Sequence, residues 1–288
     1  MSVISRREAI LATGAAGIGS LFAEQRQEGG QKVVHQARLK QSVCRWCYNK
    51  IPLAEFCRGV ADLGLTAMDL LPPADWETAR QFGLTCSMGT VSAGTIPNGL
   101  NNPAHHHTIL KAFEQNIPLA AKYGVPNVIT FFGNLQPGMS EAEAVGHCVA
   151  GLNKVKKLGE DHGVTICVEL LNSKVDHPGY QGDHTAFGLQ VIKAVDSPRV
   201  KLLYDIYHMQ IMEGDVIRTL RANKDHIAHY HTGGVPGRNE LDDTQELNWA
   251  AVSRAIVDGG YAGFLGQEFI PSRDPLASLA QGFRICDG

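Results

Sequence analysis

The chain has 288 residues, of which 44% are hydrophobic and 19% are charged, and its formal net charge is −3. This composition is typical of a globular protein, and the length suits one large domain or two small ones. Because the charge is slightly negative and no basic block is present, the chain is not expected to bind nucleic acid. No run reaches the roughly 18 consecutive apolar residues of a membrane-spanning helix, so stable membrane insertion is not expected either.

The N-terminal residues differ in composition from the rest of the chain. Arg6 and Arg7 directly precede a short, weakly hydrophobic run rich in Ala and Gly, which is typical of twin-arginine export signals. An N-terminal helix or a disordered tail is the alternative. We expect residues 1–23 to be the export signal and the polar residues 24–41 to be a linker, which predicts a periplasmic or otherwise exported location.

Eight runs rich in apolar and β-branched residues recur along the rest of the chain, with helical patterns between them. The predicted strands cover residues 42–48, 66–71, 84–90, 127–133, 164–170, 200–206, 227–233 and 263–269. The runs are continuously apolar, which indicates strands that are buried on both faces, as in parallel sheets. After the fourth run, Ser140 and Glu143 have the spacing of a capping box, which predicts a helix that continues to about residue 161.

This alternation predicts the fold class. Eight strand–helix repeats over about 250 residues fit an α/β fold of the (β/α)8 TIM-barrel type, formed by a single domain over residues 42–288. A doubly wound open sheet is the alternative, but no Gly-x-Gly-x-x-Gly motif follows the first run. We therefore expect a closed barrel.

Polar residues end the last four predicted strands, namely Glu169, Asp205, His231 and Glu268. In a barrel the carboxyl ends of the strands form one rim, which would bring these side chains together. A buried carboxylate needs a partner for its charge. Three carboxylates and one imidazole suit one divalent metal ion such as Mn²⁺, Mg²⁺, Co²⁺ or Zn²⁺. The alternative is that the four are unrelated polar residues, each satisfied by loops or salt bridges.

Three other candidates are expected to have structural roles. His229 lies two residues before His231 on the same face and is predicted to be a buried histidine beneath the site rather than a fifth ligand. Cys44 and Cys47 form a Cys-x-x-Cys pair, but residues 42–48 are predicted to be a strand, in which positions three apart face opposite sides. We therefore expect neither redox nor metal chemistry from this pair.

Four segments together resemble a known family. They are "VELLNS" (168–173), "YDIYHMQ" (204–210), "HYHTGGVPGR" (229–238) and "GQEF" (266–269). They resemble the xylose-isomerase-like barrel superfamily, and most closely its hydroxypyruvate isomerase branch, over a region from about residue 42 to the C-terminus. The resemblance implies a TIM barrel that holds one divalent metal ion through the four strand-end residues named above.

The resemblance also implies a reaction. A hydroxypyruvate isomerase interconverts hydroxypyruvate and tartronate semialdehyde by proton transfer through an enediolate, with Glu169 and Glu268 as the catalytic acid and base. The family's supporting histidine falls on His208, whose imidazole would meet a substrate oxygen. Its substrate-binding arginine falls on Arg238, which would hold an anionic end of the substrate bidentately. A loop salt bridge between Arg238 and a nearby acid such as Glu240 is the alternative.

Two departures from the family pattern leave the substrate open. His231 stands where hydroxypyruvate isomerases often have Gln and ketose epimerases have His, and Leu170 stands where the family usually has Pro. A ketose or sugar epimerase therefore remains an alternative. A non-catalytic periplasmic sugar-binding barrel or a lyase is the alternative of another class, whereas a metal-dependent endonuclease of the superfamily would need further histidines after strands two and three. The expected partner is a small-molecule keto acid or sugar, and self-association into a homo-oligomer is left open.

Overall fold

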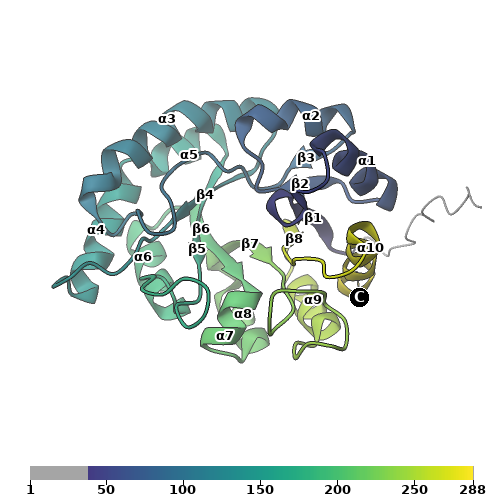
Figure 1. Cartoon of the computed structure of the whole chain (residues 1–288). Coiled ribbons are helices and arrows are strands. Elements are labelled where there is room, and N and C mark those ends of the chain that lie inside the picture. The colour runs from purple at the N-terminus through teal and green to yellow at the C-terminus, as the bar shows by residue number, and fades with distance from the viewer. Residues whose placement is uncertain (1–37, 288) are drawn as a thin grey trace, which may run out of the picture. The chain divides into compact units, whose positions relative to one another are not determined.

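Eight parallel strands alternate with helices along residues 38–287, the part of the chain that this computed structural model describes (Figure 1). The strands are β1 (Lys40–Cys44), β2 (Ala67–Asp69), β3 (Thr85–Cys86), β4 (Asn127–Phe131), β5 (Thr165–Leu170), β6 (Val200–Asp205), β7 (Ile227–His231) and β8 (Phe264–Gln267). They form one sheet in the order β3-β2-β1-β8-β7-β6-β5-β4. The predicted α/β barrel of eight parallel strands is confirmed, and each predicted strand region overlaps one observed strand.

Gly89 connects the β3 end of the sheet with β4 at its other end. Gly89, which follows the short strand β3, donates its N–H to the carbonyl of Asn127 at 2.8 Å and accepts a hydrogen bond from the N–H of Ile129 at 3.1 Å. Strand β4 is therefore joined to the segment after β3. A Cβ at position 89 would lie 2.8 Å from Cζ2 of Trp76, so a larger residue would displace the indole ring that packs there.

The helices cover the outer side of the strands (Figure 1). They are α1 (Leu53–Leu63), α2 (Trp76–Gln81), α3 (His106–Tyr123), α4 (Glu141–Asn153), α5 (Lys156–His162), α6 (Thr185–Val195), α7 (Ile206–Met212), α8 (Val216–Asn223), α9 (Trp249–Asp258) and α10 (Pro275–Cys286). Each longer helix turns an apolar face to the strands; in α1 the buried residues Phe56, Val60 and Leu63 recur at helical spacing. Along the described chain, no helix combines the length and the apolar character needed to cross a membrane.

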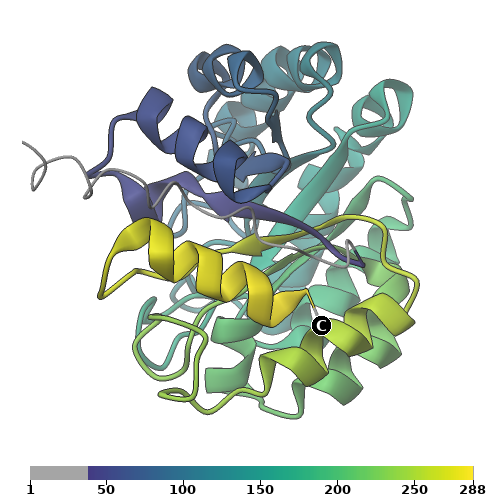
Figure 2. The same ribbon diagram turned by 90° about the vertical axis from the view of Figure 1, so that its right-hand side faces the viewer.

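The first and last elements of the described chain lie side by side (Figure 2). Strand β1 pairs with β8 in parallel, and α10 contacts α1. Alternate residues of a strand face the same side, so Cys167 and Leu203 point into the barrel like Glu169 and Asp205, which come two residues later. Cys167 and Leu203 pack with Met88 and Ile129 in a small buried apolar cluster.

The first strand differs from its predicted bounds. It begins at Lys40, so Lys40 and Gln41, which were predicted to belong to the linker 24–41, are part of the barrel. It ends at Cys44, because the chain then turns into a 3₁₀ helix, η1 (Arg45–Tyr48). The guanidinium of Arg45 donates to the carbonyls of Tyr48 and Ile51, which closes this turn. The prediction of a strand through residue 48 was therefore wrong.

The helix predicted between residue 140 and about residue 161 is also different. The capping box of Ser140 and Glu143 is present, but the segment is divided into α4 and α5. The division occurs where Val155 leaves helical backbone conformation, with φ at −120°. Residues 1–37, which include the predicted export signal and most of the predicted linker, lie outside the described residues.

Candidate active site

The carboxyl ends of β5, β6, β7 and β8 bring four titratable side chains together. One ligand-type atom from each of Glu169, Asp205, His231 and Glu268 lies within 4.8 Å of the others. All four residues are buried, with at most 5% of their surface exposed. These are the four residues predicted from the strand ends, and the shared rim of a parallel barrel explains why they meet.

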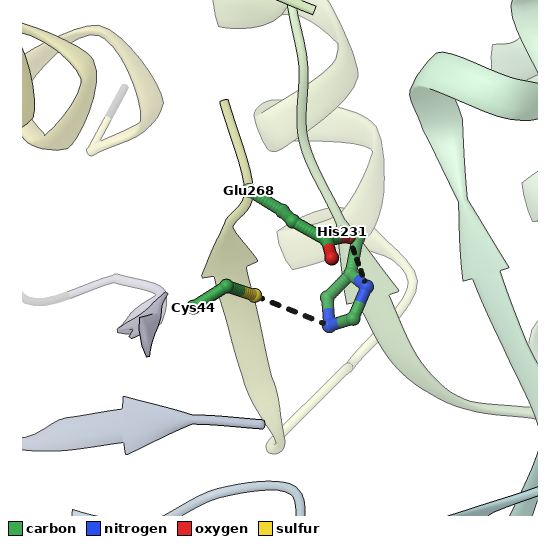
Figure 3. Close-up of side chains that lie close together, drawn as sticks. All are labelled: Cys44, His231 and Glu268. Carbon is green, nitrogen blue, oxygen red and sulfur yellow. Dashed lines mark hydrogen bonds and ion pairs between the residues drawn. The ribbon is translucent and has the colours of Figure 1, made fainter. Parts of the chain in front are cut away.

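His231 presents its two ring nitrogens to different neighbours (Figure 3). Nδ1 lies 2.7 Å from Oε2 of Glu268 and 3.5 Å from Oε1 of Glu169, whereas Nε2 lies 3.8 Å from Sγ of Cys44. Nδ1 is buried and has no aligned hydrogen-bond partner among residues 38–287. A buried ring nitrogen that faces two carboxylates at these distances is placed to share a metal ion with them, and carboxylate oxygens with one imidazole suit a divalent cation. The residues therefore fit the predicted metal ion.

Burial and neighbouring charges move the pKa values of the carboxyl groups in different directions. Burial raises the pKa of Glu169, and it raises the pKa of Asp205 to about 7 even though Arg238 lies beside that group. Burial would also raise the pKa of Glu268, but the charges of Arg238 and His231 outweigh it and hold that pKa below its usual range. Three carboxylates so close together need compensating positive charge, which a divalent ion would supply.

Arg238 lies within the site and not in a surface salt bridge. It follows β7 in the left-handed backbone region, with φ at 57°. Its Nη2 donates to Oδ2 of Asp205 at 2.7 Å and to Oε2 of Glu268 at 2.5 Å. Its Nη1 donates to Nε2 of His208 at 2.7 Å, and its Nε donates to the backbone carbonyl of Glu268 at 3.1 Å. Glu240, the alternative partner, pairs with another arginine instead.

His208, predicted to contact substrate, is buried beside Arg238. Burial, together with the charge of Arg238, holds the pKa of His208 well below its usual range. Its Nδ1 lies 2.6 Å from Nδ2 of Asn172. The side-chain oxygen of Asn172 accepts hydrogen bonds from the backbone N–H groups of Val175 and Asp176, so the loop after β5 holds this histidine in place. The predicted substrate contact of His208 stays a prediction.

Sequence reasoning missed Asp69, which ends β2 and lies beneath the four rim residues. Its Oδ2 accepts hydrogen bonds from Ser42 at 2.7 Å, Ser87 at 2.8 Å and His229 at 2.8 Å, and its Oδ1 lies 3.5 Å from Nε2 of His231. A carboxylate on the far side of a metal-ligating histidine fixes the orientation of the ring. The signal was present, because Asp69 interrupts the apolar run "TAMDLL". His229 belongs to this buried group, beneath the rim as predicted.

Trp46, on η1, forms one side of the site. Its Nε1 donates to Oε1 of Glu268 at 2.6 Å. The guanidinium carbon of Arg238 lies 5.5 Å from the centre of the Trp46 ring system and 4.7 Å from the centre of the Tyr207 ring, both within the range of cation–π attraction. Arg238 therefore contacts one aromatic ring from η1, after β1, and one from α7, after β6.

Comparison with known proteins agrees with this fold. Residues 59–286 match the family model described as xylose isomerase-like TIM barrel. The chain is 26% identical over 213 residues to the hydroxypyruvate isomerase of Escherichia coli (strain K12), with 73% of this chain and 74% of the relative covered. It is 23% identical over 234 residues to the 2-oxo-tetronate isomerase of Pectobacterium atrosepticum, with 78% and 88% covered.

Among solved structures, the crystal structure of AP endonuclease, family 2, from Brucella melitensis superposes with a TM-score of 0.76 at 22% sequence identity. The alignment covers 84% of this chain and 97% of that chain, which shows a common fold. The family model covers most of the chain, including all four rim residues. The chain therefore belongs to the xylose isomerase-like TIM barrel family, as the sequence resemblance predicted.

Proposed function

We propose that the protein is a metal-dependent isomerase or epimerase that moves a proton beside the carbonyl group of a small keto acid or keto sugar. The observation that carries this proposal is the convergence of Glu169, Asp205, His231 and Glu268 within 4.8 Å of one another. The relatives named hydroxypyruvate isomerase and 2-oxo-tetronate isomerase support the same class of reaction.

The two glutamates have the proton-transfer role in this proposal. Glu169, Asp205, His231 and Glu268 would hold the divalent ion, which would supply electrostatic stabilisation of the negative charge that develops on the substrate during proton transfer. Glu169 comes from β5 and Glu268 follows β8, so one can remove the proton and the other can return it. Arg238 and Trp46 each donate to one oxygen of Glu268, at 2.5 Å and 2.6 Å, which orients that carboxylate before substrate arrives.

Two finer reactions fit the proposal. Interconversion of hydroxypyruvate and tartronate semialdehyde is the reaction that the family resemblance implies, and it is the first to test. Epimerisation of a ketose is the second candidate, because the cavity above the rim residues has a volume of 740 Å³. That volume lies in the range of about 300–1,000 Å³ typical of sites for drug-sized ligands, well above the needs of a three-carbon acid.

Deuterium exchange in heavy water tests the reaction class. The Mn²⁺-loaded protein is incubated with hydroxypyruvate or with a series of free ketoses, and loss of the proton signal beside the carbonyl is followed by NMR. Glu169→Gln and Glu268→Gln should each slow exchange by about 10²- to 10⁴-fold while the circular dichroism spectrum stays unchanged. Glu55→Gln, on the exposed face of α1, is the matched control. Wild-type rates in either site variant would exclude the two-glutamate scheme, and no exchange with any keto acid, free ketose or keto glycoside would exclude an isomerase.

We also propose that residues 1–23 direct export of the folded protein. The support is the pair Arg6 and Arg7 immediately before a weakly hydrophobic run. Replacing both arginines by lysine should retain the protein in the cytoplasm, as measured by cell fractionation. Unchanged export of the double variant would contradict the proposal.

A further inference from the structure

The cavity above the rim residues is larger than the reacting end of a substrate needs. Glu169, His208, Arg238 and Glu268 line its base, so the 740 Å³ cavity is continuous with the candidate active site. A carbonyl group and its neighbouring hydroxyl would occupy this base. The rest of the volume lies beyond the catalytic groups, so it bears on the part of the substrate that does not react.

The walls of this cavity are mainly apolar. They are lined by the side chains Leu70, Ile96, Ile129, Phe131 and Leu171. The polar side chains beside the base are largely engaged with each other: the hydroxyl of Tyr207 donates to Oδ2 of Asp176 at 2.9 Å. An unsubstituted sugar carries a hydroxyl on nearly every carbon, and each one left unpaired on burial costs about 1–3 kcal/mol. The walls therefore favour an apolar group.

The opening of the cavity towards solvent is lined by apolar side chains. Within residues 38–287, the large hydrophobic side chains that are exposed are Trp46, Leu135, Val175 and Ile270, with exposed fractions between 39% and 64%. Three of these four, Trp46, Val175 and Ile270, line this one cavity. A cluster of exposed apolar side chains around a pocket marks a surface that a ligand covers.

Trp46 reaches from the base of the cavity to its opening. Its indole N–H donates a hydrogen bond to Glu268 at the base, while 39% of the residue is exposed at the opening. The hydrogen bond and the stacking on Arg238 fix the ring before any ligand binds. A preorganised aromatic ring lowers the entropy cost of binding an apolar or ring-shaped group against it.

The hydrogen bonds of Arg238 bear on the charge of the substrate. A guanidinium has five N–H donors, and in Arg238 four of these are directed to protein acceptors: two from Nη2, one from Nη1 and one from Nε. One donor remains, which does not suffice for a bidentate grip on a substrate carboxylate. This arrangement favours an uncharged substrate over a keto acid.

We propose that the substrate is an uncharged keto sugar that carries an apolar substituent, such as an aryl or alkyl group on its anomeric oxygen. The keto and hydroxyl groups lie at the rim residues of the barrel, and the substituent lies against Trp46, Val175 and Ile270. The assignment of the reacting end rests on the proposed function. The assignment of the apolar substituent rests on the apolar walls and opening of the cavity.

Binding measurements test this proposal without requiring turnover. Two keto glycosides that differ only in a methyl or a phenyl group on the anomeric oxygen are titrated into the Mn²⁺-loaded protein by calorimetry, with hydroxypyruvate as a third ligand. The phenyl compound should bind at least tenfold more tightly than the methyl compound and more tightly than hydroxypyruvate. Val175→Ser and Ile270→Ser should each reduce the phenyl-to-methyl ratio. Leu135→Ser, which removes an equally exposed side chain outside the cavity, should leave the ratio unchanged.

The outcomes separate this inference from the proposed function. Equal affinity for the methyl and phenyl compounds, or tighter binding of hydroxypyruvate, would overturn the inference even if hydroxypyruvate exchanges its proton. A phenyl preference that depends on Val175 and Ile270, without deuterium exchange in any compound, would support the inference about the cavity and overturn the proposed reaction. A phenyl preference that Val175→Ser and Ile270→Ser both retain would place the substituent elsewhere and overturn the inference.

Discussion

Replacing Glu240 with Gln should loosen the loops that support the site. Glu240 is 4% exposed and lies in the loop after β7, two residues beyond Arg238. Its carboxylate accepts hydrogen bonds from the hydroxyls of Ser272 and Ser278, both at 2.8 Å, and from the N–H of Ser272 at 2.9 Å. It therefore ties the loop that carries Arg238 to the loop after β8 and to α10. Burial would raise the pKa of Glu240, but these hydrogen bonds outweigh it and lower the pKa to about 2.

The size of the effect follows from that pKa. The ordinary pKa of a glutamate is 4.5, and one pKa unit corresponds to about 1.4 kcal/mol. Ionised Glu240 thus contributes about 3 kcal/mol to the free energy of unfolding at pH 7. Because the pKa is lower in the folded chain than in the unfolded chain, this contribution is fully present above about pH 5 and is lost as the pH falls towards 2.

Urea unfolding of the wild type and of Glu240→Gln at pH 7, 5 and 3 measures this contribution. The difference in the free energy of unfolding should be about 3 kcal/mol at pH 7 and pH 5, and should fall to about half of that or less at pH 3. Glu114→Gln, on the exposed face of α3, is the control and should change little at any pH. A difference below about 1 kcal/mol at pH 7, or one that does not change with pH, would refute the reasoning.

Three further outcomes are expected. Gly266→Ala should weaken Mn²⁺ binding at least about tenfold in calorimetry, because the added Cβ would lie 2.7 Å from both Oδ2 of Asp69 and Cδ2 of His231; unchanged affinity would argue against His231 as a ligand. Mn²⁺ at 100 times its Kd should add about 2.7 kcal/mol to the free energy of unfolding, and Asp205→Asn should remove most of that gain. Tyr180→Phe should lower the free energy of unfolding by about 2 kcal/mol in urea titrations. The buried hydroxyl of Tyr180 donates to the carbonyl of Glu169 at 2.8 Å and accepts from the N–H of Phe132 at 2.9 Å, and both bonds would be lost. A loss below about 0.5 kcal/mol would contradict that reasoning.

The four rim residues could be predicted because parallel strands allow few alternatives. Glu169 and Asp205 end continuously apolar runs, and a shift of one residue would have turned each carboxylate to the outside of the barrel. Cys167 and Leu203, two residues earlier, are buried inside the barrel, which shows that the register inferred from the sequence holds. The carboxyl ends of parallel strands then meet at one rim irrespective of the loops.

The loop residues of the site could not be placed in the same way. Arg238 reaches Asp205 and Glu268 because the loop after β7 turns back over the barrel through a left-handed residue, and no local pattern specifies which distant acid an arginine will meet. Trp46 was assigned to a strand, whereas the 3₁₀ turn after Cys44 brings its indole to Glu268. The role of Asp69 depends on partners from other strands, which only the packed barrel reveals.

The charges at the base of the cavity bear on the proposed substrate class separately from its walls. Glu169, Asp205 and Glu268 contribute three negative charges when ionised, and Arg238 together with one divalent ion would contribute three positive charges. A neutral keto sugar would leave this buried group balanced. A keto acid would add a negative charge where one guanidinium donor remains, and an uncompensated buried charge is strongly destabilising. Because charge balance does not depend on the volume or polarity of the walls, it supports an uncharged substrate independently of the shape of the cavity.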